Sequence, residues 1–368
     1  MMQLIERDIA SLDEDVCDTL PELKDIDILF QDKENSSGGA PEDSVDVSSN
    51  ANGGNPADQY TGFRTEKAKG TITVKYTGIY YAILQASVMI TQALFCSSGL
   101  SRLIENLIPS AEALTAIIIR FFLNQGHLGR MEVDWTGQEQ WSIERKTGTT
   151  LEDYMKANIW SRIGATCTTF HPEKNRDILP PQLEMALRTR MEDGQTHISP
   201  GRVILEYPRK NDLGGIGLFG TADDYIKFLV ALLQGGKGLL SERSVDALFQ
   251  PRLDRSIRSA MLVGAGKQMR RILGAKDTDD VDQADHSLAG TVTLRDIPGR
   301  RRKGTVSWAG LPNLHWWIDR ESGIAATLFT QLLPSMDALV VDLLTELEEG
   351  LYEFVLGGEF RNSRLHKI

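Results

Sequence analysis

The chain has 368 residues, of which 41% are hydrophobic, and this is enough to bury the core of one large domain. It carries 40 basic and 51 acidic side chains, a formal net charge of −11, which argues against a general affinity for nucleic acid or for anionic membranes. Its three cysteines, Cys17, Cys96 and Cys167, are too few and too widely spaced for a disulfide framework or a zinc site. We therefore expect a cytoplasmic protein without a metal or another cofactor.

The first nine residues have the pattern of a helix. Apolar side chains recur along it at Met1, Met2, Leu4, Ile5 and Ile9, and no capping residue precedes them. This pattern predicts that the chain begins inside a helical element.

Residues 35–58 are rich in Ser, Gly, Asn, Asp and Pro, with too little apolar surface to offset the entropy of ordering them. The 34 residues before this segment are too few to fold alone. We interpret 35–58 as a flexible insertion within a single domain that spans residues 1–368.

Residues 76–101 contain no charged side chain. A segment of this length could span a bilayer. However, its Ser, Thr and Gln side chains would be costly at the membrane centre, and no second clear span follows. A membrane role is therefore not expected.

Three helices in the second half of the chain are predicted from their caps. They are expected to run from Thr150 to Ile159, from Thr221 to Leu233 and from Ser241 to Phe249. In the second helix, Asp224 would complete a capping box with Thr221, and Gly235-Gly236 would end the helix. The loop 214–221 before the second helix contains Gly214, Gly215 and Gly217. It lacks the parallel strand, the Lys-Ser/Thr pair and the ribose carboxylate of a nucleotide site, so nucleotide binding is not expected.

Residues 251–299 form a charged connection from which little structure can be predicted. The basic run 300–303, Arg-Arg-Arg-Lys, follows it. We interpret this run as a solvated charge cluster on a loop.

The C-terminal part of the sequence predicts three antiparallel strands and a helix. Strand-forming residues occupy 305–308, 314–318 and 324–329, with turn residues between them. The third run is almost wholly apolar, so we expect it inside the sheet with both faces covered. The helix begins at Asp337, and its expected sheet-facing stripe is Val340, Leu343, Leu344, Leu347, Leu351 and Val355.

The segment 308–334 carries a family resemblance. Its ordered pieces, Trp-Ala-Gly-Leu-Pro-Asn, Trp-Trp-Ile-Asp and Gln-Leu-Leu-Pro, resemble the third active-site motif of the serine β-lactamase-like family, the class C and penicillin-binding-protein type. They are similar in particular to those of fungal lovastatin-type acyl transesterases. The stretches 134–148 and 163–170 match the same family in order. The resemblance implies an α+β fold in which helices flank an antiparallel sheet and an all-α lobe lies beside it.

The resemblance also implies site residues. In the family the third motif supplies an oxyanion-hole amide and the wall of the acyl pocket, which here would be the amide of Leu311 and a wall formed by Trp308, Gly310 and Leu311. The family's glycine loop skirts the cleft, which makes Gly215 a substrate-binding candidate. The alternative is that Trp308, like the other two tryptophans of this hairpin, is a core aromatic side chain.

Other family features are missing from the sequence. No Ser-x-x-Lys nucleophile motif occurs in it, and we expect that motif, with the first strands and the start of the nucleophile helix, ahead of Met1. The segment expected to carry the catalytic tyrosine, 126–133, has none, and His127 is its only proton carrier, or else a surface histidine without a role. Residues 76–93 separate pieces that are nearly contiguous in the family, as an unspliced intron would.

Two functions therefore remain open. One is a serine acyltransferase, transesterase or esterase of secondary metabolism that moves an acyl group from a thioester, free or on a carrier protein, or from an ester to a small-molecule alcohol. The other is a catalytically inactive pseudoenzyme or incomplete gene product. An in-frame Ser-x-x-Lys helix upstream of Met1 would separate them.

Overall fold

The structure is a computed structural model that describes residues 1–21, 27–31, 63–67, 138–177, 179–191, 194–201, 211–212, 214–215 and 217–357. The predictions made for 35–58, for the uncharged segment 76–101 with its insertion 76–93, and for His127 fall outside these residues.

The described chain contains both helices and strands. The helices are α1 (Met2–Glu6), α2 (Val16–Thr19), α7 (Gln138–Thr147), α8 (Leu151–Met155), the π-helical turn η5 (Lys156–Trp160), α9 (Ser161–Ile163), the 3-10 turn η6 (Pro172–Lys174), α10 (Ala222–Leu233), α11 (Glu242–Phe249), α12 (Arg255–Gly264), α13 (Gly266–Leu273) and α14 (Ala338–Leu356). The strands are β1 (Asp27–Gln31), β2 (Phe63–Lys67), β3 (Ala186–Arg190), β4 (Thr196–Pro200), β5 (Ala284–His286), β6 (Thr291–Thr293), β7 (Val306–Gly310), β8 (Leu314–Asp319), β9 (Ile324–Leu328) and β10 (Leu332–Leu333).

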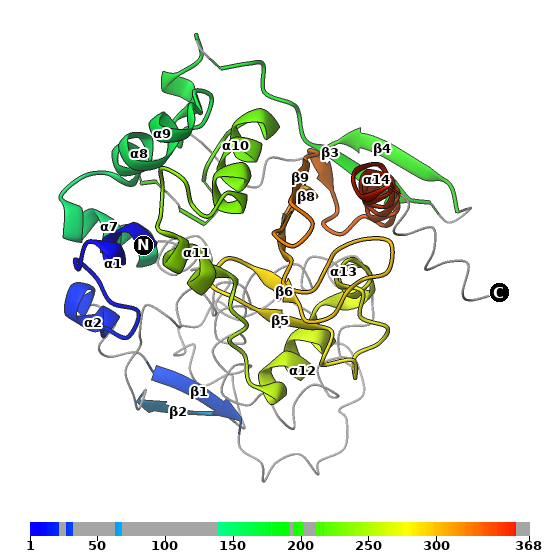
Figure 1. Cartoon of the computed structure of the whole chain (residues 1–368), viewed down its shortest axis with the longest axis horizontal. Coiled ribbons are helices and arrows are strands. Elements are labelled where there is room, and N and C mark those ends of the chain that lie inside the picture. The colour runs from blue at the N-terminus through cyan, green and yellow to red at the C-terminus, as the bar shows by residue number, and fades with distance from the viewer. Residues whose placement is uncertain are drawn as a thin grey trace, which may run out of the picture.

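A five-stranded antiparallel sheet, in the order β5-β6-β7-β8-β9, separates two groups of helices (Figure 1). On one face, Leu229 and Leu232 of α10 and side chains of α11 pack against Val306 and Ile318 of the sheet. On the other face, side chains of α13 and α14 pack against Trp317. Helices α1, α7 and α8 share a further apolar cluster beside the sheet. The predicted α+β fold, with a helix-flanked sheet and a helical lobe, is confirmed.

The predicted helix starts are confirmed at their caps. Thr150, Thr221 and Ser241 each accept a hydrogen bond from the backbone N–H three residues on, and Asp337 does the same for α14. The capping box at Thr221 is only half formed, because the Asp224 carboxylate instead accepts from the amide of Cys167, at 2.6 Å. Asp224 thereby ties α10 to the loop after α9.

One prediction about the C-terminal elements is confirmed and another is partly wrong. Both faces of β9 are covered as predicted, because Ala325 packs on the α10 side and Ile324, Ala326 and Leu328 pack on the α14 side. The predicted stripe of α14 is right for Val340, Leu344 and Leu351, whereas Leu343, Leu347 and Val355 are about half exposed. The buried side of α14 also carries two polar residues, Glu348 and Tyr352.

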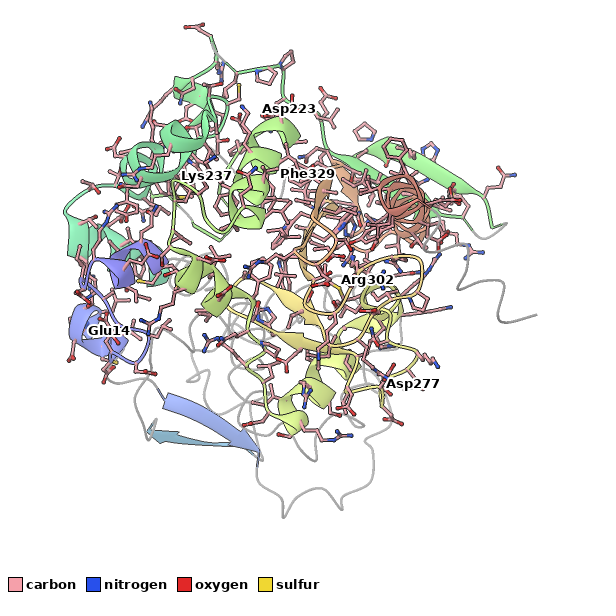
Figure 2. The ribbon with its side chains drawn as sticks, in the orientation of Figure 1. Glu14, Asp223, Lys237, Asp277, Arg302 and Phe329 are labelled. Carbon is pink, nitrogen blue, oxygen red and sulfur yellow. The ribbon has the colours of Figure 1, made fainter. Side chains whose placement is uncertain are left out.

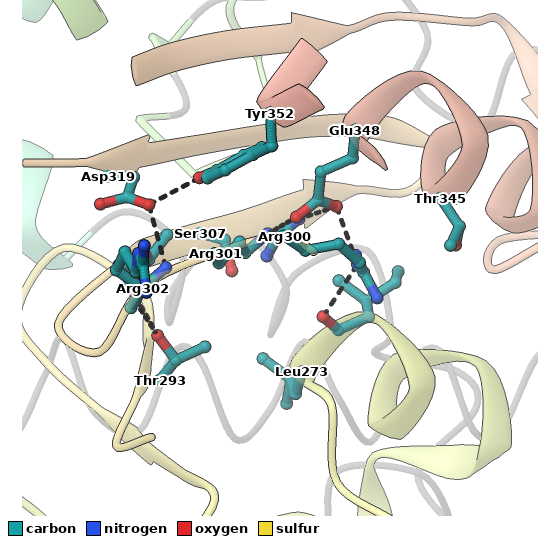
Figure 3. Close-up of polar contacts among 12 residues, drawn as sticks. Leu273, Thr293, Arg300, Arg301, Arg302, Ser307, Asp319, Thr345, Glu348 and Tyr352 are labelled. Atoms are coloured by element: carbon teal, nitrogen blue, oxygen red, sulfur yellow. Dashed lines mark hydrogen bonds and ion pairs between the residues drawn. The ribbon is translucent and has the colours of Figure 1, made fainter. Parts of the chain in front are cut away.

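The interpretation of 300–303 as a solvated cluster is wrong for its first two residues. Arg300 and Arg301 are 5% and 1% exposed, and both pair with the fully buried Glu348, at 2.8 and 2.7 Å (Figure 3). The Arg301 guanidinium also lies 5.1 Å from the centre of the Trp317 ring. Charged side chains on a loop are expected to be solvated. These two arginines can be buried because a carboxylate on α14 compensates their charge.

A second polar contact extends this buried network. The Tyr352 hydroxyl donates to Asp319 at 2.7 Å, and Asp319 also accepts from the amide of Arg302 (Figure 3). Burial, with the nearby Asp319 carboxylate, raises the pKa of Tyr352. We name Arg300, Arg301, Asp319, Glu348 and Tyr352 the α14 network, and it fixes α14 against the sheet.

Candidate functional site

The end of β7 forms an open strand edge. β6 pairs with β7 only through Val292–Val306 and Thr291–Ser307, so the following residues of β7 have a partner strand on the β8 side alone within the described chain. The Thr305 carbonyl accepts from the Thr293 amide at 3.0 Å, and backbone groups alternate along a strand. The backbone of Ala309 therefore points toward the open edge and can pair with a ligand.

The tight turn after β7 is anchored by Asn313. This residue is fully buried and adopts a left-handed conformation with φ of 58°, which asparagine tolerates better than most side chains. Its side-chain amide donates to the carbonyls of Leu332 and Pro334 at 2.7 and 2.9 Å, and its oxygen accepts from the Asp337 amide at 3.1 Å. The turn is thus tied to β10 and to the start of α14.

Leu311, the candidate oxyanion amide, lies in this turn. The carbonyl of the next residue, Pro312, accepts from the Thr330 hydroxyl, which adds a second tie from the segment after β9. Position 310 has little room for a side chain, because a Cβ there would lie 3.2 Å from the Cβ of Leu314. An amide in so constrained a turn is preorganised, which is what oxyanion stabilisation requires.

An aromatic wall covers the α10 side of this strand end. Trp308 and Trp316 lie directly opposite each other on β7 and β8, on the face that packs against α10. Tyr225 of α10 lies 6.3 Å from Trp316 and 5.3 Å from Phe329, ring centre to ring centre, and Phe329 follows β9 beside α10 (Figure 2). Because Trp308 is only half buried, it has surface left for an apolar ligand, whereas Trp317, 3% exposed, is a core side chain as the alternative prediction held.

A residue that the sequence did not predict, His286, ends β5 beside this wall. Its ring packs edge to face on Trp308, with ring centres 5.5 Å apart and planes at 82°. Burial lowers the pKa of His286 to about 4, so the imidazole is neutral at physiological pH. The run Asp285-His286-Ser287 ahead of a glycine is a polar signal that could have indicated it.

The other predicted substrate residue, Gly215, lies on a different segment. It is exposed in the loop ahead of α10. The structure brings together Trp308, Gly310 and Leu311 and leaves Gly215 as a separate candidate on the α10 side.

Two further features bear on the class of protein. In the described ranges, no group of three or more His, Cys, Asp and Glu side chains is arranged to hold a metal ion. None of the helices that the structure describes is both long and apolar enough to cross a membrane.

Sequence comparison finds relatives among fungal proteins. The chain is 30% identical over 230 residues to monacolin J acid methylbutanoyltransferase of Aspergillus terreus, a match covering 60% of this chain and 52% of the relative. It is 29% identical over 225 residues to lovastatin esterase of Penicillium rubens, covering 60% of this chain and 54% of that protein. The chain thus spans about half the length of these relatives.

The fold comparison extends over more of the chain. The structure of a simvastatin synthase variant from Aspergillus terreus superposes with a TM-score of 0.66 and 24% identity, over 97% of this chain and 78% of the other. A family model described as Beta-lactamase matches residues 141–349, more than half of the chain, including the turn at Leu311. The chain belongs to the beta-lactamase family.

Proposed function

We propose that this protein is a serine acyltransferase, transesterase or esterase that moves an acyl group from a thioester or ester to a small-molecule alcohol. The observation that carries the proposal is the open edge of β7 leading into the constrained amide of Leu311, beside the half-buried Trp308. A strand edge can pair with the acyl part of a ligand, a rigid amide can hold an oxyanion, and an indole can line an apolar acyl pocket. Trp308, Gly310, Leu311 and Gly215 are the proposed substrate-binding residues.

The relatives support the same chemistry. One is named a methylbutanoyltransferase and another an esterase, and the two reactions differ only in whether an alcohol or water accepts the acyl group. The proposed donor is an acyl thioester, free or on a carrier protein, and the proposed location is the cytoplasm. No nucleic acid or membrane partner is part of the proposal.

Covalent acyl transfer needs a nucleophile. A serine oxygen attacks the acyl carbon and gives its proton to a base, and the thiol leaves with that proton. The acceptor alcohol then attacks the acyl-serine ester, and its proton passes through the base to the departing serine oxygen. The 368-residue sequence contains no Ser-x-x-Lys motif for the first step. This observation favours a second candidate function, a catalytically inactive family member that binds an acyl ligand without transferring it.

Intact-mass measurement separates the two functions. The 368-residue chain is incubated with a fluorophosphonate probe and, separately, with a short acyl thioester. We expect no stoichiometric adduct on it, and one adduct on a protein in which the gene places a Ser-x-x-Lys helix in frame ahead of Met1. An adduct mapped to a serine of the 368-residue chain would show that the nucleophile lies elsewhere, and an extended protein without any adduct would favour the inactive candidate.

A further inference from the structure

We propose that His286 is a further ligand-binding residue of this site, which hydrogen-bonds a hydroxyl oxygen of the acyl acceptor beside Trp308. The inference rests on the proposed function, because it assigns the acceptor's place in that same site. It concerns a residue on β5, two strands away from the Leu311 turn in the sheet order.

The polar atoms of the His286 side chain are buried without a partner. The residue is 6% exposed, and neither Nδ1 nor Nε2 has a partner at hydrogen-bond distance and angle among the described residues, although the Ser287 backbone lies near enough to raise the pKa of the ring. Its backbone, by contrast, is fully paired, with the N–H donating to Asp285 and the carbonyl accepting from Arg252. Buried polar groups are nearly always satisfied in native proteins, so an unpaired imidazole is costly unless a ligand satisfies it.

The neighbouring carboxylate does not serve this imidazole. Asp285 accepts from the backbone amides of Arg252, Leu253 and His286, at 3.1, 2.9 and 2.6 Å, and its second oxygen lies 3.6 Å from Nε of Arg258. His286 is therefore not the base of a His-Asp pair. Its lowered pKa, about 4, also makes it a poor proton acceptor at neutral pH, which leaves hydrogen bonding as its role.

The chemistry of a neutral imidazole specifies the group that it binds. One ring nitrogen donates and the other accepts, and a hydroxyl can pair with either, because it too both donates and accepts. An ester or thioester carbonyl can only accept. Since Trp308 packs against the same ring at a steep angle, a hydroxyl on an apolar carbon skeleton fits this position best, and that is the chemistry of the proposed acceptor.

His315 provides a matched control. It is also a buried histidine, 2% exposed, and its Nε2 has no partner among the described side chains. It lies opposite Ala309 on the α14-facing side of the sheet, in the electrostatic field of Arg301 and Glu348, and not on the Trp308 side. A change at His315 should therefore leave ligand binding at Trp308 unaffected.

The first test needs no ligand. His286→Phe keeps an aromatic ring against Trp308 and removes the two unpaired nitrogens, so we expect the melting temperature of the unliganded chain to rise, by about 3 °C. A melting temperature lowered or unchanged by His286→Phe would mean that the imidazole is already satisfied in the folded protein, and would overturn the proposal.

The second test measures binding by isothermal titration with monacolin J acid, the compound in the name of one relative. His286→Gln, which keeps a donor and an acceptor, should bind within about threefold of the wild-type chain, and His286→Phe at least about tenfold more weakly. If packing alone mattered, the order would reverse, because Phe keeps the ring and Gln loses it, and the reversed order would overturn the inference. His315→Phe should bind as the wild type does.

The two failures are distinguishable. If the wild-type chain does not bind monacolin J acid and His286→Phe still raises the melting temperature, the proposed acceptor is wrong. The conclusion that the His286 imidazole is unpaired in the free protein is then retained. If the wild type binds and His286→Phe binds equally well, the proposed function survives and the role of His286 does not.

Discussion

The five-stranded sheet has a charged network on one face and an aromatic strand end on the other. On the α14 side, two arginines share one fully buried carboxylate, and Tyr352 donates to Asp319, so charged groups are compensated by partners within the fold. On the α10 side, the cluster is apolar and aromatic, and β7 has no described partner strand beyond Ser307 on its β6 side. The ring of His286, at the end of β5, meets Trp308 at this strand end and has no described hydrogen-bond partner.

This difference distinguishes polar groups that maintain the fold from polar groups that are available to bind a ligand. A compensated ion network holds one arrangement of α14, since each member is costly to bury without the others. Unpaired groups beside a half-buried tryptophan stabilise nothing in the free protein, and their cost is recovered only when a ligand pairs with them. We therefore assign ligand binding to the α10 side and fold maintenance to the α14 side.

The largest expected effect comes from breaking the α14 network. Glu348→Leu leaves Arg300 and Arg301 buried without a counter-charge, and removal of one member of a buried ion pair typically costs about 3 to 5 kcal/mol of unfolding free energy. Urea denaturation measures the change. Glu346→Leu, an exposed position on the same helix, is the control and should change the unfolding free energy by less than about 0.5 kcal/mol. Equal effects of the two substitutions would show that the network does not hold α14.

The next effect is a dependence of stability on pH that comes from two buried histidines. Burial lowers the pKa of His286 and of His315 to about 4, from 6.5. The unfolded chain therefore binds more protons than the folded one below pH 6.5, so stability is complete above that pH and is lost as the pH falls toward 4, by up to about 3 kcal/mol for each histidine.

Urea denaturation at pH 7, 6, 5 and 4.5 tests this dependence, and a chain with both His286→Phe and His315→Phe should show a flatter profile. Carboxylates with lowered pKa, such as Asp224 and Asp296, lose their contribution at lower pH, as it falls below their ordinary value of 3.8. A wild-type stability that stays constant between pH 7 and 4.5 would contradict the buried neutral state of both histidines.

A smaller effect is expected at the turn between β7 and β8, which is tied to β10 and to the start of α14. Asn313→Ala removes two donated bonds and one accepted bond in a buried, left-handed position, which should cost about 2 kcal/mol of unfolding free energy. Asn211, which is exposed, offers a matched Asn→Ala control with little expected change. If Asn313→Ala lowers stability without weakening binding of an acyl ligand, the turn matters for the fold but does not position Leu311.

The smallest effect concerns the acyl chain. We predict that the Leu311 side chain narrows the pocket and favours small or linear acyl groups. In an active form of the protein, Leu311→Gly should raise the rate with branched acyl thioesters relative to linear ones by a factor of a few, about 1 kcal/mol of discrimination. The ratio of kcat/KM values for a linear and a branched donor measures it, and an unchanged ratio would remove Leu311 from the pocket.

The sequence predicts those parts of the fold that local chemistry decides. The three strands of the C-terminal hairpins and the helix starts at Thr150, Thr221, Ser241 and Asp337 follow from strand-forming runs and from capping side chains. The strand end that carries Trp308 and Leu311 is found because its residues occur together in one stretch.

What the sequence does not predict depends on contacts between distant segments. Glu348 looks like a solvated residue until Arg300 and Arg301, 48 and 47 positions away, neutralise it. The strands β5 and β6 have three residues each and were not predicted within the charged connection. His286 meets Trp308 only when those strands join the sheet.

Photoaffinity labelling tests most directly the claim that ligands bind on the α10 side. An acyl thioester with a diazirine at the end of its acyl chain is photolysed with the protein, and the labelled peptides are mapped by mass spectrometry. We predict labelling at 306–316 and at 214–229, reduced by excess unlabelled thioester. Labelling concentrated on the exposed leucines of α14, or labelling that excess thioester does not reduce, would contradict the assignment.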